Sequence, residues 1–125
     1  MRQIKFRAQD IASNKWLYGD LRHHKDDVCI FEQGGEKGEQ VKRDTVGLFT
    51  GVCDMDGKEI YEGDVLVIEG IKTDRYSKVW WNNERFTFYV GLSPISAYLL
   101  ENGRLKNFRV AGNIYDNPEL KEKLV

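Results

Sequence analysis

Short stretches of the chain alternate apolar and polar residues with a period of two. Ile4, Phe6 and Ala8 have basic residues between them, which is the pattern of a strand with one buried face. Further stretches of strand type follow at residues 16–23, 28–31, 46–52, 65–68, 76–81, 86–90 and 108–111. Many short strands separated by turn-forming residues predict a mainly β protein.

A glycine-rich segment follows the third predicted strand. Residues 33–40 hold three glycines among charged and polar residues, a composition typical of a flexible connection. The 125 residues are the usual length of one domain, and no proline-rich linker divides them. We therefore expect a single domain over residues 1–125 with a flexible loop at about 33–40.

Two turns have a chemical explanation in the sequence. Asp54 can accept a hydrogen bond from the backbone N–H two residues on, and Gly57 can adopt positive φ without a Cβ penalty. Gly63 and Asp64 stand before an apolar strand and predict a tight turn into it. A calcium loop would need glycine at its sixth position and a glutamate where Val65 stands. We assign these residues as structural turns.

Helix signals occur only toward the end of the chain. Asn117 suits a cap, Pro118 a first helical position, and lysines follow in the last turn, so we expect a short helix over 118–124. Ser93 and Pro94 also suit a helix start, which leaves 94–101 open between a short helix and an irregular strand. The pattern as a whole predicts a strongly bent sheet or a small SH3-like barrel with a short C-terminal helix.

The polar residues around Asn83 predict a hairpin between two aromatic strands. A turn of two or four residues there would place Trp81 opposite Phe86 and Val79 opposite Phe88. These four side chains would then share one face of the sheet. Cross-strand apolar pairs of this kind make a core face.

The other face of the same hairpin is the strongest binding signal in the sequence. The period of two places Tyr76, Trp80 and Tyr89 on it, together with a lysine and a threonine. Aromatic rings beside polar groups are typical of the centre of a protein interface. We predict Tyr76, Trp80 and Tyr89 as interface residues; the alternative is that the C-terminal segment around Phe108 or Leu120 covers them.

Charge and hydropathy narrow the classes of partner. The chain has 19 basic and 20 acidic residues and a formal net charge of −1. Proteins held on nucleic acid by phosphate contacts usually carry a basic surplus, so nucleic-acid binding is disfavoured without being excluded. No apolar run approaches the roughly 20 residues that cross a bilayer, so we expect no membrane partner.

No combination of residues in the sequence predicts a catalytic, metal-binding or cofactor-binding site. His23 and His24 are adjacent, and on a strand they would point to opposite faces, which prevents them from ligating one ion. Cys29 and Cys53 lack metal-ligand spacing and are expected to be free thiols in a cytoplasm. The chain has no nucleophile elbow and no phosphate-binding loop in the right context. We therefore expect no catalytic residues, no metal and no cofactor, and do not expect an enzyme.

The chain resembles the YopX family, small proteins encoded by bacteriophages and prophages. The resemblance is carried by residues 45–51 (TVGLFTG) and 56–65 (DGKEIYEGDV), with 4–8 (IKFRA), Trp16 and 18–20 (YGD) at the start and 112–120 (GNIYDNPEL) at the close. It implies a β-rich fold, no assigned activity and a place in the cytoplasm of a bacterial host cell. It gives no catalytic residues to carry over.

The leading functional hypothesis is therefore a non-enzymatic accessory protein. It would act through contacts with itself, as a homo-oligomer, or with a phage or host protein. The alternative is a small β-barrel module that binds nucleic acid, and a small enzyme ranks third.

Overall fold

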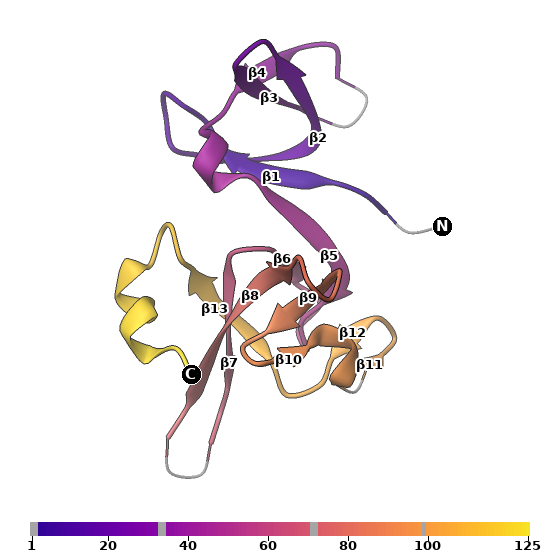
Figure 1. The fold of residues 1–125 in the computed structure, drawn as a ribbon, viewed down its shortest axis with the longest axis vertical. Coiled ribbons are helices and arrows are strands. Elements are labelled where there is room, and N and C mark those ends of the chain that lie inside the picture. Colours follow the sequence, from indigo (N-terminus) through magenta and orange to yellow (C-terminus); the bar gives the residue numbers. More distant parts are fainter. Residues whose placement is uncertain (1–2, 33–34, 71–72, 99) are drawn as a thin grey trace. The chain divides into compact units, whose positions relative to one another are not determined.

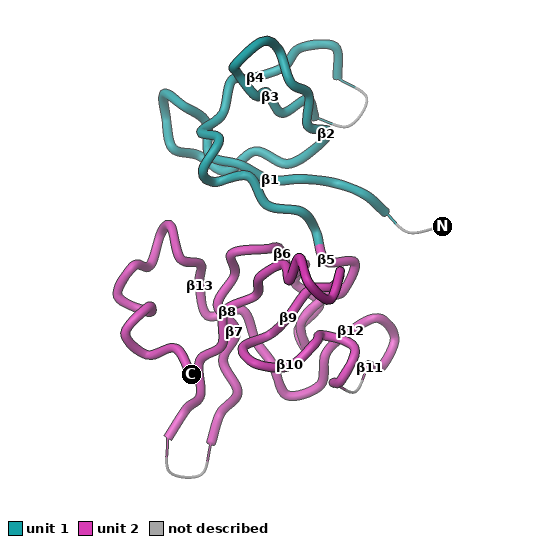
Figure 2. The backbone as a smooth tube through the Cα atoms, viewed as in Figure 1, with its two compact units in different colours: residues 1–49 teal, residues 50–125 magenta. Residues whose placement is uncertain are grey.

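The computed structural model describes residues 3–32, 35–70, 73–98 and 100–125. Within them the chain is mainly β, as the alternation predicts, and its only helical elements are three short 3₁₀ helices. It divides into two compact units, residues 1–49 and 50–125 (Figures 1 and 2).

Unit 1 is an antiparallel sheet of strands that are neighbours in sequence. The paired order is β1 (Phe6–Gln9), β2 (Trp16–His24), β3 (Asp27–Phe31) and β4 (Gly38–Gln40). The 3₁₀ helix η1 (Arg43–Thr45) leads to β5 (Gly47–Cys53), whose first residues pair with β1. The alternating residues meet in a buried core of Ala8, Val28, Ile30 and Val41. The three N-terminal strands thus follow the predicted pattern.

Two glycines allow close approach within this sheet. A Cβ on Gly19 would lie 2.0 Å from the carbonyl oxygen of Phe31, and a Cβ on Gly38 would lie 2.3 Å from the Phe31 ring. Because Gly38 lets the chain pack against Phe31, residues Gly38–Gln40 form β4 and pair with β3. The loop predicted at 33–40 is therefore shorter than expected; its positions 33–34 lie outside the described residues.

Unit 2 is built on an antiparallel five-stranded sheet. Its order is β10 (Ser93–Pro94), β9 (Thr87–Val90), β8 (Arg75–Asn82), β7 (Asp64–Ile68) and β13 (Arg109–Asn113). The end of β5 pairs with β6 (Glu59–Tyr61) and with β12 (Arg104–Leu105), which forms a hairpin with β11 (Leu100–Glu101). The buried core is Ile60, Leu66, Val79, Val90, Leu105 and Phe108.

The barrel alternative is wrong. Within the part of the chain that the structure describes, the strands form two open sheets. At the edge strand β13, the Val110 N–H donates to the Asp54 carboxylate at 3.0 Å, and the Asn113 N–H donates to the Asn117 side-chain oxygen at 3.2 Å. Side chains thus take donors that another strand would need in order to continue and close the sheet.

The C-terminal helix and its cap differ from the prediction. Residues Pro118–Lys123 form a 3₁₀ helix, η3, with the proline at its start as expected. Asn117 does not cap it, because its side-chain oxygen accepts the Asn113 N–H instead. The sequence left segment 94–101 undecided between a helix and a strand. In the structure Pro94 is the last residue of β10, Ile95–Ala97 form one 3₁₀ turn, η2, and Leu100 is the first residue of β11. Neither segment therefore forms an α-helix.

Candidate functional site

Trp80 and Tyr89 meet on one face of the β8–β9 hairpin. They lie directly opposite each other in the register, and their ring centroids are 5.1 Å apart. The Trp80 indole N–H donates to the backbone carbonyl of Gly91 at 2.8 Å, which fixes the ring. Both side chains are half-buried, so part of each ring remains accessible on this face.

Tyr76, the third predicted interface residue, lies under the end of the chain. Leu124 forms a parallel bridge with Tyr76, and the Val125 N–H donates to the Tyr76 carbonyl at 3.0 Å. The Lys123 ammonium lies 5.4 Å from the ring centroid, within cation–π range. Residues 123–125 therefore contact Tyr76, in place of the segment around Phe108 or Leu120, and Tyr76 is half-buried like Trp80 and Tyr89.

An apolar groove lies beside Trp80, where the chain leaves β9. Its volume is about 340 Å³, and it is lined by Lys78, Trp80, Gly91, Leu92, Leu124 and Val125. Leu92 is 88 % exposed and Val125 is 60 % exposed. The groove thus places Trp80 beside two aliphatic side chains, Leu92 and Val125, that are largely exposed.

The register at the tip of the hairpin differs from the prediction. Trp81 lies opposite Phe88, and Val79 lies opposite Val90, a shift of two residues. A shift of two keeps every side chain on its face of the sheet, so Val79 and Phe88 are buried as expected. Phe86, however, leaves the strand and joins the loop.

Asn82 holds this loop. Its side-chain oxygen accepts the backbone N–H of Glu84 at 2.9 Å and that of Arg85 at 3.1 Å, and its carbonyl accepts the Phe86 N–H at 2.8 Å. The Trp81 indole N–H donates to the Asn83 side chain at 2.8 Å. These hydrogen bonds hold the backbone of the loop, including that of Phe86.

Phe86 combines two unfavourable properties. Its φ of 53° lies in the left-handed region, which costs an L-residue roughly 1–2 kcal/mol. Its ring is 79 % exposed, so burial offsets little of that cost. Asparagine or glycine is the usual residue in this conformation. A bulky apolar residue held there is a candidate for a binding role.

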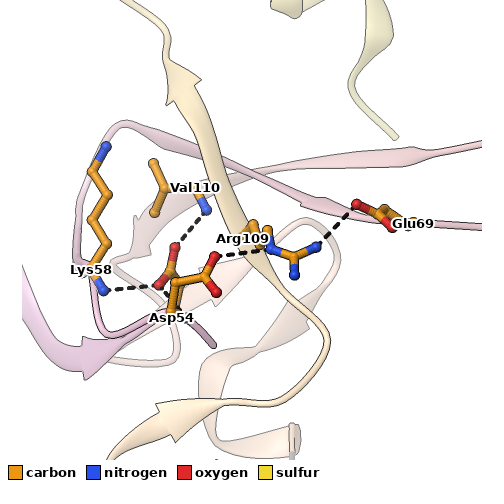
Figure 3. Close-up of polar contacts among 6 residues, drawn as sticks. Asp54, Lys58, Glu69, Arg109 and Val110 are labelled. Carbon is orange, nitrogen blue, oxygen red and sulfur yellow. Dashed lines mark hydrogen bonds and ion pairs between the residues drawn. The ribbon is translucent and has the colours of Figure 1, made fainter.

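The predicted turn at Asp54 connects two parts of unit 2, the β5–β6 hairpin and strand β13 (Figure 3). The Asp54 carboxylate is 2 % exposed. One oxygen accepts the backbone N–H of Asp56 and of Lys58, each at 2.9 Å, and the other accepts the Val110 N–H at 3.0 Å. Gly57 has φ of 87°, the positive value predicted for it. The turn therefore joins the β5–β6 hairpin to β13 and acts as structure.

Arg109 adds an ion-pair network on the surface of the same turn. Its Nε lies 2.9 Å from the Asp56 carboxylate, and its terminal nitrogen lies 3.0 Å from Glu69 (Figure 3). The hydrogen bond to Asp56 and the charge of Asp56, with a smaller contribution from Glu69, raise the pKa of Arg109. All three side chains are substantially exposed, so the network contributes little to stability.

Gly57→Ala is expected to lower the free energy of unfolding by about 1 kcal/mol, because positive φ is less favourable for alanine than for glycine. The added Cβ would lie 3.0 Å from the Arg104 guanidinium, whose flexible end can move away. Urea unfolding of the two proteins measures the difference. Unchanged stability, or a rise in wild-type stability on adding micromolar calcium, would contradict the structural assignment.

The second predicted turn also has the expected form. Gly63 has φ of 93°; its N–H donates to the Val79 carbonyl at 2.9 Å, and its carbonyl accepts the Ile114 N–H at 3.0 Å. The Asp64 carboxylate accepts the Tyr61 N–H at 2.8 Å. This turn places the start of β7 between β8 and β13.

The residues that suggest chemistry do not converge. Among the described residues, no group of three or more His, Cys, Asp and Glu side chains could hold a metal ion. His23 and His24 are exposed at the end of β2, while Cys29 and Cys53 are half-buried and are not joined to each other by a disulfide. None of the described helices is long and apolar enough to span a membrane.

The described part of the chain is thus mainly β, with two open sheets. Its β8–β9 hairpin carries exposed aromatic side chains. A family model described as YopX protein matches residues 5–122. The chain therefore belongs to the YopX family, as the sequence resemblance indicates.

Among solved structures, the chain is similar to the crystal structure of protein EF1440 from Enterococcus faecalis. The two share 24 % sequence identity and superpose with a TM-score of 0.59, over 96 % of this chain and 99 % of that chain. At this identity the likeness shows the fold. A search of curated proteins found no match.

Proposed function

We propose that the protein is a non-enzymatic accessory protein of a phage or prophage that acts in the bacterial cytoplasm through protein–protein contacts. The phage or prophage setting is what the resemblance to the YopX family implies, and the family model matches residues 5–122. The β8–β9 hairpin supplies the contact surface. Its aromatic pair, Trp80 and Tyr89, forms one part, and its tip, with Trp81 and Phe86, forms the other.

The exposed, left-handed Phe86 is the observation that carries the proposal. A residue that is unfavourable for the free protein is explained if its ring is buried when a partner binds. Aromatic residues supply much of the energy of protein interfaces. A loop that is already fixed loses little conformational entropy on binding, and the hydrogen bonds of Asn82 fix this one.

Trp81 extends the same surface. Its ring is 38 % exposed and packs edge-on against Phe88, with centroids 5.0 Å apart. Its indole N–H is already bonded to Asn83, so burying it against a partner leaves no donor unsatisfied. Trp81 and Phe86 together give the tip two large, exposed rings.

Site-specific photo-cross-linking tests the proposal. The photoreactive residue p-benzoylphenylalanine is placed at Phe86 in one variant. In a matched control it is placed at Leu100, which is 52 % exposed on β11 of the same unit. Irradiation in bacterial cells is expected to give a discrete protein adduct from position 86 and none from position 100. No adduct, or the same adducts from both positions, would contradict a contact at the tip.

A further inference from the structure

Unit 1 has a cavity on the face of its sheet that points away from the core. Val28 and Ile30 of β3 pack in the core. Because side chains alternate along a strand, the other residues of β3 point to the opposite face. A cavity of about 380 Å³ lies on that face. Its lining includes Arg22, His24, Asp27, Cys29 and Phe31.

Arg22 supplies hydrogen-bond donors at one end of this cavity. Its guanidinium carbon lies 4.1 Å from the centroid of the Phe31 ring, within cation–π range. The ring packs closely on Gly38 of β4, where an added Cβ would lie 2.3 Å from it. Among the described residues, the guanidinium has no hydrogen-bond or ion-pair partner. Its fork of N–H groups is therefore available to a ligand.

Asp27 supplies acceptors at the other end. It is four residues from Phe31 along β3, and Cys29 stands between them on the same face. The Asp27 carboxylate is exposed and forms no ion pair with any described residue. Asp20 is also on β2 and stands opposite Phe31, but it does not line the cavity and is not paired with Arg22. The cavity thus offers donors at one end, acceptors at the other, and a half-buried thiol between them.

Guanine has the complementary pattern of polar groups. One edge of the base carries two acceptors, O6 and N7, which an arginine fork binds with two hydrogen bonds. The opposite edge carries the N2 amino group, a donor that a carboxylate accepts. Adenine has an amino group in place of O6, so it presents a donor where the fork needs an acceptor. A closed cavity of roughly 150 Å³ holds benzene in an engineered protein, so a cavity of about 380 Å³ has room for a purine.

We infer that this cavity binds the base of a guanine nucleoside or nucleotide. Arg22 donates to O6 and N7, and Asp27 accepts from the opposite edge. The inference goes beyond the proposed function, because the cavity belongs to unit 1 and the protein contact belongs to the β8–β9 hairpin of unit 2. The base carries the recognition, so a phosphate group on the ligand adds no required contact.

Isothermal titration calorimetry of the full chain with guanosine tests the site. Saturable binding is expected, and guanosine monophosphate should bind with similar affinity. Inosine, which lacks the N2 amino group, and adenosine should each bind at least about tenfold more weakly, since each loses a hydrogen bond to a charged group. Absence of saturable guanosine binding would overturn the inference. So would equal binding of adenosine, or binding of the monophosphate alone.

Three variants with matched chemistry locate the site. Arg22→Met removes the fork, and Asp27→Asn removes the carboxylate; both positions are exposed, so both variants are expected to fold. Asp20→Asn is the control, because Asp20 is an exposed carboxylate outside the cavity. Guanosine should bind at least about tenfold more weakly to the first two variants and unchanged to the control. Unchanged binding to Arg22→Met, or the same loss in all three variants, would contradict the assignment.

Discussion

Asp54→Ala is expected to lower the free energy of unfolding by about 3–5 kcal/mol. The substitution removes one carboxylate and leaves the backbone N–H groups of Asp56, Lys58 and Val110 without their acceptor. A buried donor without a partner costs roughly 1–3 kcal/mol, and the 2 % exposure of Asp54 gives water little access to replace the lost oxygens. The substitution therefore removes hydrogen bonds from the β5–β6 turn and from the edge strand β13 at the same time.

Urea unfolding with a matched control measures this effect. Asp56→Ala removes a neighbouring carboxylate that is 59 % exposed and bonded to Arg109, so it is expected to cost less than about 1 kcal/mol. Asp54→Asn keeps one acceptor oxygen and should fall between the two. Equal losses for Asp54→Ala and Asp56→Ala would show that the buried carboxylate does not hold the β5–β6 hairpin and β13 together.

Gly19→Ala is expected to destabilise unit 1 by about 3 kcal/mol or more. The new Cβ would lie 2.0 Å from the carbonyl oxygen of Phe31 and 2.8 Å from its carbonyl carbon. Both atoms are backbone, and Asp20 pairs with Phe31 in the β2–β3 register. The strands must therefore separate to make room, which is costlier than a side-chain adjustment in a packed core.

Gly51→Ala is the control for this substitution. Gly51 has φ of 89°, and no heavy atom lies within 4 Å of its added Cβ, so only the backbone preference is lost, about 1 kcal/mol. Urea unfolding followed by two-dimensional NMR compares the variants, and shifts or losses of the peaks of β1, β2 and β3 are expected only for Gly19→Ala. Similar behaviour of both variants would contradict the steric explanation.

The strands were predictable because their signal is local. Alternation over a few residues reports one buried face, and it located β1, β2, β3 and β8 directly from the sequence. The Asp54 turn was predictable for the same reason, since its first hydrogen bond, to the Asp56 N–H, spans two residues. Its third bond, to Val110, joins residues 56 positions apart, which no local pattern reports.

The loops were less predictable because one side chain can change a turn. Asn82 bonds to two backbone N–H groups, lengthens the loop and removes Phe86 from the core face. Asn82, an asparagine at the start of a polar segment, is the sequence signal for such a loop. The alternation of aromatic residues instead predicted that the strand begins at Phe86. A local signal was available for the hairpin of β11 and β12, because Asn102-Gly103 is the usual two-residue hairpin turn and both residues have positive φ, 54° and 76°.

The candidate site was predicted in part. Trp80 and Tyr89 are paired across the strands, and the period of two was enough to place them on one face. Phe86 was assigned to the wrong environment, and the contact of Tyr76 with residues 123–125 joins segments that are distant in the sequence. The interface role of Tyr76, Trp80 and Tyr89 stays a prediction.

The central claim is that Phe86 is held in a conformation that costs stability and is kept for a contact. The free energy of unfolding of Phe86→Asn, compared with that of Phe86→Ala, tests it most directly. Alanine retains the left-handed cost and removes only an exposed ring, so it should match the wild type. Asparagine relieves the cost and should be more stable than alanine by about 0.5–1 kcal/mol. If asparagine gave no gain over alanine, or if both variants fell well below the wild type, Phe86 would be a structural residue and the claim would be wrong.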